Sequence, residues 1–95
     1  MITWTQEQSI NFECAREVIT DLISIYTTKI YIEKKKPEPD LKLIESYSTE
    51  QTRLRRERTA LNLLDDSAVA LVRSKYSPVV RSMREEHREE WSKLV

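Results

Sequence analysis

The segment Phe12–Tyr26, with the sequence FECAREVITDLISIY, decides how the rest of the chain can fold. On a helix with about 100° per residue, its apolar side chains cover one half of the circumference and its polar side chains cover the other. The apolar half consists of Phe12, Cys14, Ala15, Val18, Ile19, Leu22, Ile23, Ile25 and Tyr26. This face is broader than one neighbouring helix can cover, so it predicts two helical neighbours.

The composition agrees with an all-α fold. The 95 residues include no glycine, the residue that supplies hairpin turns and the loops that hold phosphates. Sixteen acidic and sixteen basic side chains cancel, so the net charge gives no attraction to nucleic acid or membrane. The N-terminus does not resemble a signal peptide, and no apolar run reaches the roughly 20 residues of a membrane span. We therefore expect one cytoplasmic domain over residues 1–95.

The first helix is predicted over residues 6–33. Thr5 and Gln8 have the spacing of a capping box, which marks its start. The β-branched residues within Ile23–Ile32 would also suit a strand, which leaves the end of this helix open. Residues 34–40 contain two prolines and are expected to form a linker, and Asp40 at its end is a suitable N-cap for the next helix.

A second, longer helix is predicted over residues 41–76, because apolar residues keep one phase along it for about 50 Å. A capping-box pattern makes a break near Tyr47 the main alternative. Ser77 as N-cap and Pro78 as first helical residue predict a third helix over 78–94. The expected fold is a three-helix antiparallel bundle, or a long helical hairpin with a third packed helix.

No pattern in the sequence predicts a catalytic site, a metal site or a cofactor. His87 is the only histidine and falls on an apolar stripe with Met83 and Trp91, where a partly buried structural role is expected. Cys14 falls on the buried half of the first helix, where a cysteine behaves as a small hydrophobe. One His and one Cys show none of the paired spacings of zinc sites. We therefore expect a protein that is not an enzyme.

One region of the chain is basic. Between the linker and the middle of the second helix, acids such as Glu50 and Glu57 are interleaved with the bases, and the arginines point to several sides of a helix. This region supports only an alternative function, a helical nucleic-acid-binding or regulatory protein. Its candidate contact residues are Lys34, Lys35, Lys36, Arg53, Arg55 and Arg56.

Arg58 and Asp65 fall within the predicted apolar stripe of the second helix. Either they lie at its edge and extend into solvent, or the stripe meets another protein there. Further acidic residues are expected to face a basic partner surface. The candidate protein-binding residues are Arg58, Asp65, Asp66, Glu85, Glu86, Glu89 and Glu90.

The predicted function is a small non-enzymatic protein–protein interaction module that binds one partner protein. Rigid helices without recognisable chemistry suit an inhibitor that neutralises a toxic enzyme, for example a nuclease, by covering its surface. Small bacterial immunity proteins and antitoxins act in this manner. An enzyme whose cleft is completed by a second subunit is the least favoured class, and the wide face of the first helix leaves a homodimer open.

Overall fold

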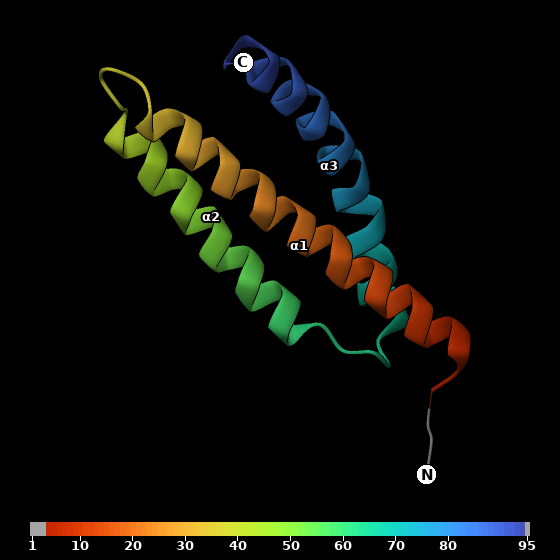
Figure 1. Ribbon diagram of the computed structural model, residues 1–95. Coiled ribbons are helices and arrows are strands. Elements are labelled where there is room, and N and C mark those ends of the chain that lie inside the picture. Colours follow the sequence, from red (N-terminus) through yellow and green to blue (C-terminus); the bar gives the residue numbers. More distant parts are fainter. Residues whose placement is uncertain (1–3, 95) are drawn as a thin grey trace.

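The computed structural model of the chain describes residues 4–94, except for the side chains of residues 87, 90, 91 and 94. The described residues form three helices: α1 (Gln6–Lys34), α2 (Leu41–Ala60) and α3 (Asp66–Leu94). α1 packs against both other helices, and α2 runs back alongside it as the second arm of a hairpin (Figure 1). The predicted fold, a helical bundle made of a long hairpin and a third packed helix, is confirmed.

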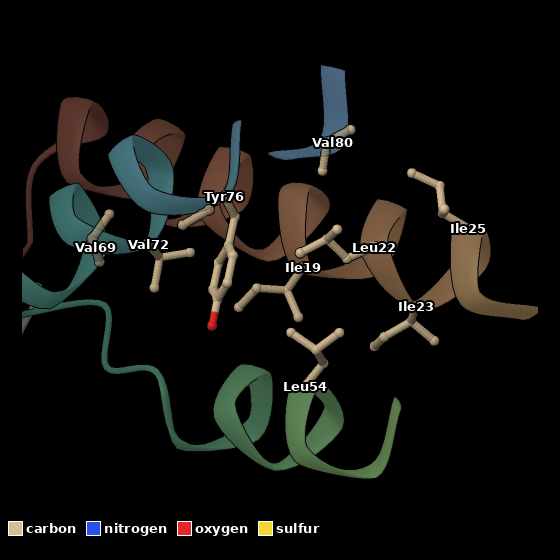
Figure 2. Close-up of a cluster of buried hydrophobic side chains, with 10 residues drawn as sticks. Ile19, Leu22, Ile23, Ile25, Leu54, Val69, Val72, Tyr76 and Val80 are labelled. Atoms are coloured by element: carbon tan, nitrogen blue, oxygen red, sulfur yellow. The ribbon is translucent and has the colours of Figure 1, made fainter. Parts of the chain in front are cut away.

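The apolar face of α1 explains this arrangement, because it is covered from two sides. Leu54 of α2 reaches Ile19 and Ile23 of α1 from one side, and Val72 and Tyr76 of α3 approach from another (Figure 2). The buried core consists of Ala15, Ile19, Leu22, Ile23, Ile25, Leu54, Val69, Val72, Tyr76 and Val80. The prediction that α1 needs two helical neighbours is therefore correct.

One buried polar side chain fixes how α2 lies along α1. Gln51 is buried, and its Nε2 donates hydrogen bonds to the carbonyl oxygen of Ile23 at 2.9 Å and to Thr27 Oγ1 at 2.6 Å. A buried amide without such acceptors would cost free energy. Sliding α2 along α1 would remove both bonds, so Gln51 contributes specificity as well as packing.

The start of α1 is as predicted. Thr5 and Gln8 form the capping box, in which each side chain accepts a hydrogen bond from the other's backbone N–H. The helix continues through Ile23–Ile32, so the strand alternative for that segment is wrong. Within it, the Thr27 and Thr28 hydroxyls donate to backbone carbonyls one turn earlier, which satisfies these β-branched polar residues inside a helix.

The predicted continuous helix over residues 41–76 is wrong. α2 ends at Ala60, and the break is not near Tyr47, which lies inside α2. In the connection 61–65, the Asn62 side chain accepts a hydrogen bond from the Leu64 N–H at 2.9 Å, which forms a local turn. Asp65 Oδ1 then accepts from the Ala68 N–H at 3.0 Å and caps α3. These local hydrogen bonds stabilise a break in the helix, although the apolar residues keep one helical phase across the connection.

The predicted helix start at Ser77 and Pro78 is also wrong. α3 begins at Asp66 and contains Pro78 in its interior. A proline there removes one backbone hydrogen bond and costs about 3 kcal/mol. The helix continues through it, and Tyr76 and Val80, on either side of the proline, are both buried in the core.

The turn between α1 and α2 is organised by Glu33, which is buried at the end of α1. Its carboxylate accepts hydrogen bonds from Lys36 Nζ at 3.0 Å and from the Asp40 N–H at 3.1 Å. Asp40 in turn caps α2 through the Leu43 N–H, as predicted. The hydrogen bond from Lys36, followed by that from Asp40, holds the pKa of Glu33 below its usual value of 4.5.

This lowered pKa predicts a pH dependence of stability. The carboxylate form of Glu33 stabilises the fold above about pH 4.5, and this contribution is lost as the pH falls through its lower folded-state pKa. We expect Glu33→Gln to be less stable than the wild type at pH 7, and the difference to shrink toward pH 3. Urea unfolding of both proteins across this range measures it, and a difference independent of pH would contradict the assignment.

Candidate functional site

The first acidic pair of the predicted binding set lies at the start of α3. Asp65 is exposed and caps the helix, while the exposed Asp66 accepts a hydrogen bond from Gln8 Nε2 at 3.0 Å. Acidic residues at this position also interact favourably with the positive end of the helix dipole. Both carboxylates therefore have structural roles: Asp65 caps α3, and Asp66 joins the N-terminal ends of α1 and α3.

Arg58 and Asp65 do not share a helix face, contrary to prediction. Arg58 lies in the last turns of α2, half-buried, and its Nη1 donates to Thr20 Oγ1 on α1 at 2.9 Å. Asp65 lies after the end of α2, in the connection to α3. The structure thus gives Arg58 a contact within the chain, and its use as an anchor for a partner stays a prediction.

The second acidic group lies in the last third of α3. Glu85, Glu86 and Glu89 are exposed, whereas the side chain of Glu90 lies outside the described part of the structure. Glu86 approaches Lys29 Nζ at 3.8 Å. Glu85 lies nineteen positions after Asp66, which corresponds to about 28 Å along the helix. The predicted acidic residues therefore form two separate groups.

The outer face of α3 combines apolar and acidic residues. Its apolar part contains Leu71, which is 63% exposed, and Val79, which is 40% exposed. At about 100° per residue, the exposed residues of this face lie within roughly one third of the circumference. We define the outer face as Leu71, Lys75, Pro78, Val79, Ser82, Glu85, Glu86 and Glu89. It is apolar toward the start of α3 and acidic toward its end.

The predicted basic region does not form one surface. Lys34, Lys35 and Lys36 lie at the hairpin turn. There, Lys35 Nζ lies 5.1 Å from the centroid of the Tyr31 ring, and Lys36 forms an ion pair with Glu33. Arg53 lies twelve residues into α2, which is about 18 Å along the helix. Arg55 and Arg56 are exposed there and line a shallow depression with Thr59 and Ala60.

Arg53 belongs to a polar network that joins α2 to α3. It donates to Glu50 Oε2 at 2.7 Å and to Glu57 Oε2 at 3.1 Å. The hydroxyl of the buried Tyr76 donates to the same Glu57 oxygen at 2.7 Å and accepts from Arg53 Nη1 at 3.3 Å. The hydrogen bonds from Arg53, first to Glu50 and then to Tyr76, raise the pKa of its guanidinium. Arg53, one of the residues predicted to contact nucleic acid, therefore forms its hydrogen bonds within the chain.

We expect Tyr76→Phe to lower the free energy of unfolding by about 1–2 kcal/mol. The change keeps the ring but removes the hydroxyl that joins Glu57 to α3, and hydrogen bonds to charged groups are the stronger kind. Chemical unfolding measures this loss. Tyr31→Phe is the control, because Tyr31 is exposed and its substitution should change stability by less than about 0.5 kcal/mol. Equal effects of both substitutions would contradict a role for the network.

Sequence reasoning missed a row of arginines along the groove between α1 and α3. Arg81, Arg84 and Arg88 line a groove of about 290 Å³ together with Val18 and Val80. Their spacing of i, i+3 and i+7 places them on one helix face, and this spacing is the signal that could have revealed them.

The described residues show no metal site and no membrane span. No three His, Cys, Asp or Glu residues among them are arranged to hold a metal ion, and none of the described helical stretches is apolar enough over a sufficient length to cross a bilayer. Cys14 is half-buried, and the side chain of His87 is outside the described structure. Comparison of the chain with protein-family models, curated proteins and solved structures finds no match.

Proposed function

We propose that the chain is a small non-enzymatic protein-binding module and that the outer face of α3 is its binding surface. The observation that supports this most is the position of Leu71 and Val79, two large apolar side chains left exposed on a helix whose opposite face is buried in the core. Apolar side chains of this kind gain most when a partner covers them. α2 lies against α1 and leaves this face open (Figure 1).

The charge of the outer face suggests the chemistry of the partner. Glu85, Glu86 and Glu89 follow the apolar residues and outnumber the exposed bases in the same helical phase, which are Lys75 and Lys93. Glu86 also lies 3.8 Å from Lys29 Nζ of α1. An acidic surface attracts a basic partner and speeds its association. We therefore propose one partner protein with a basic surface beside an apolar patch. A toxic enzyme such as a nuclease has this chemistry at its substrate cleft, and covering the cleft would make this chain an inhibitor of the immunity-protein or antitoxin type.

Leu71→Asp is expected to weaken partner binding without unfolding the chain. A tagged wild-type chain should recover one protein from a lysate of its own cells as a one-to-one complex, whose mass is measured by light scattering. Leu71→Asp places a charge in the apolar part of the interface and should lower the affinity at least tenfold. Leu41→Asp is the matched control, because Leu41 is 75% exposed on α2 and lies far from the outer face.

Two results would contradict this proposal. If the Leu71 and Leu41 variants lose the partner equally, or if both retain it, the outer face of α3 is not the binding surface. If the purified partner is an enzyme, adding one equivalent of the chain should stop its turnover. Unchanged turnover in the complex would remove the inhibitor function while leaving protein binding intact.

Nucleic-acid binding is the second candidate function. It is favoured by Arg55 and Arg56, which are exposed on α2 and form no ion pair with any described residue. Recovery of RNA or DNA that weakens steeply with added salt, and that is lost on replacing these two arginines by glutamine, would support this function instead.

A further inference from the structure

The groove between α1 and α3 has features of a second binding surface, which adjoins the outer face at Glu85. Val18 of α1 and Val80 of α3 contribute its apolar lining, and Ser77 contributes a hydroxyl group. Arg81 and Arg88 extend over the groove from positions seven residues apart, which is about 10 Å along the helix. An apolar lining beside two guanidinium groups suits a ligand with both apolar and anionic groups.

The charges in the groove are only partly balanced within the chain. Arg84 Nη2 is paired with Asp21 Oδ2 at 3.0 Å, which fixes α3 against α1. Arg81 and Arg88 form no ion pair or hydrogen bond with any residue in the described part of the chain. Arginine presents a planar fork of donors that matches a carboxylate, so these two side chains are available for anionic groups of a ligand.

We infer that this groove binds an acidic helix of a protein partner. Two carboxylates about two turns apart on such a helix match the spacing of Arg81 and Arg88, and an apolar side chain between them would lie on Val18 and Val80. A nucleic-acid strand fits less well, because it carries a phosphate at every nucleotide and would place some of them beside the carboxylate of Glu85, whereas a helix can place its two carboxylates at Arg81 and Arg88 alone. The groove favours an acidic ligand and the outer face favours a basic one, so the two would contact different partner surfaces.

The test uses a labelled synthetic helical peptide as the probe, with glutamates at positions i and i+7 beside a stripe of leucines. Its binding to the full chain is measured by fluorescence anisotropy. The double variant Arg81→Gln, Arg88→Gln should weaken binding at least tenfold, because both guanidinium groups that would pair with the peptide are lost. The matched control, Arg55→Gln with Arg56→Gln, removes the same charge from α2 and should change the affinity by less than about twofold.

Glu85→Gln tests whether the groove prefers an anionic ligand. Glu85 lines the groove, so removing its carboxylate should tighten binding of the acidic peptide. The same substitution should weaken binding of a basic partner to the outer face. Leu71→Asp should leave peptide binding unchanged, so failure of this inference and failure of the proposed function give different results.

Several outcomes would overturn the inference. These are no peptide binding, equal weakening by the control variant, or peptide-induced NMR shifts that avoid Val18 and Ser77. Binding of a duplex DNA oligonucleotide that depends on Arg81 and Arg88, with no binding of the peptide, would make the groove a nucleic-acid site. Light scattering that shows a dimer of the free chain, dissociated by the double variant, would make a second copy of the chain its ligand.

Discussion

Leu54→Ala is expected to lower the free energy of unfolding by roughly 2–5 kcal/mol, the usual cost of such a change in a protein core. Leu54 is 1% exposed and points from α2 toward Ile19 and Ile23 of α1 (Figure 2). Leu54 is the one hydrophobic side chain of α2 in the buried core, so its truncation removes the main apolar contact between α2 and the core. Because small domains have total stabilities of about 5–15 kcal/mol, this change should be visible as a large fall in the urea midpoint.

Leu41→Ala is the control for this measurement. Leu41 lies on the same helix but is 75% exposed, so its truncation should change stability by no more than about 0.5 kcal/mol. A small effect at Leu54 would mean that α2 does not pack on α1 as described. It would also remove the basis for treating the hairpin as the rigid support of α3.

Pro78→Ala is expected to stabilise the protein, by as much as about 3 kcal/mol. Proline in the interior of α3 lacks the N–H that would donate to the carbonyl oxygen of Ser74 one turn earlier. Alanine restores this donor and is exposed at that position, so it loses no packing. The comparison is with Ser82→Ala, an exposed site one turn further along α3, where the gain should be about 0.5 kcal/mol from helix propensity alone.

The sign of the Pro78 result is informative because the sequence predicts the opposite. If a separate helix began at Pro78, proline would suit its first position, and alanine would leave stability unchanged or lower it. A stabilised Pro78→Ala protein therefore supports one continuous α3. A destabilised one would contradict the position of the outer face, since Leu71 and Glu89 would then lie on different helices.

The sequence predicts α1 and the hairpin turn well because their signals are local and agree with each other. The capping box at Thr5, the clean apolar phase to Tyr26 and the N-cap at Asp40 all appear in the structure. The sequence also predicts that α1 needs two neighbours, since the width of its apolar face is a property of α1 alone.

The connection between α2 and α3 could not be predicted from periodicity. Leu61, Leu64 and Leu71 keep the apolar phase of one long helix across residues 61–65, yet Leu64 and Leu71 are exposed. The helical phase of a leucine in the sequence does not show whether its side chain is buried or exposed. The decisive bonds are those of Asn62 and Asp65 to nearby backbone N–H groups, and these residue types favour turns and caps without requiring them.

The candidate sites were only partly predictable, because helical periodicity does not show which face of a helix packs against a neighbour. The exposure of Glu85, Glu86 and Glu89 follows from helix phase, and the structure agrees. The arginine-lined groove depends on which face of α3 lies beside α1, and that became clear only once α3 was known to continue through Pro78. The pairing of Arg84 with Asp21, sixty-three positions apart in the chain, has no local signal.

The proposal that the outer face of α3 binds a partner is tested most directly by hydroxyl-radical footprinting of the free chain and of its complex. This method reports solvent access of individual side chains. We predict that oxidation of Leu71 falls sharply in the complex, while oxidation of Leu41 on α2 stays the same. Unchanged oxidation of Leu71, with protection appearing instead at Leu41 or along α2, would contradict the proposal.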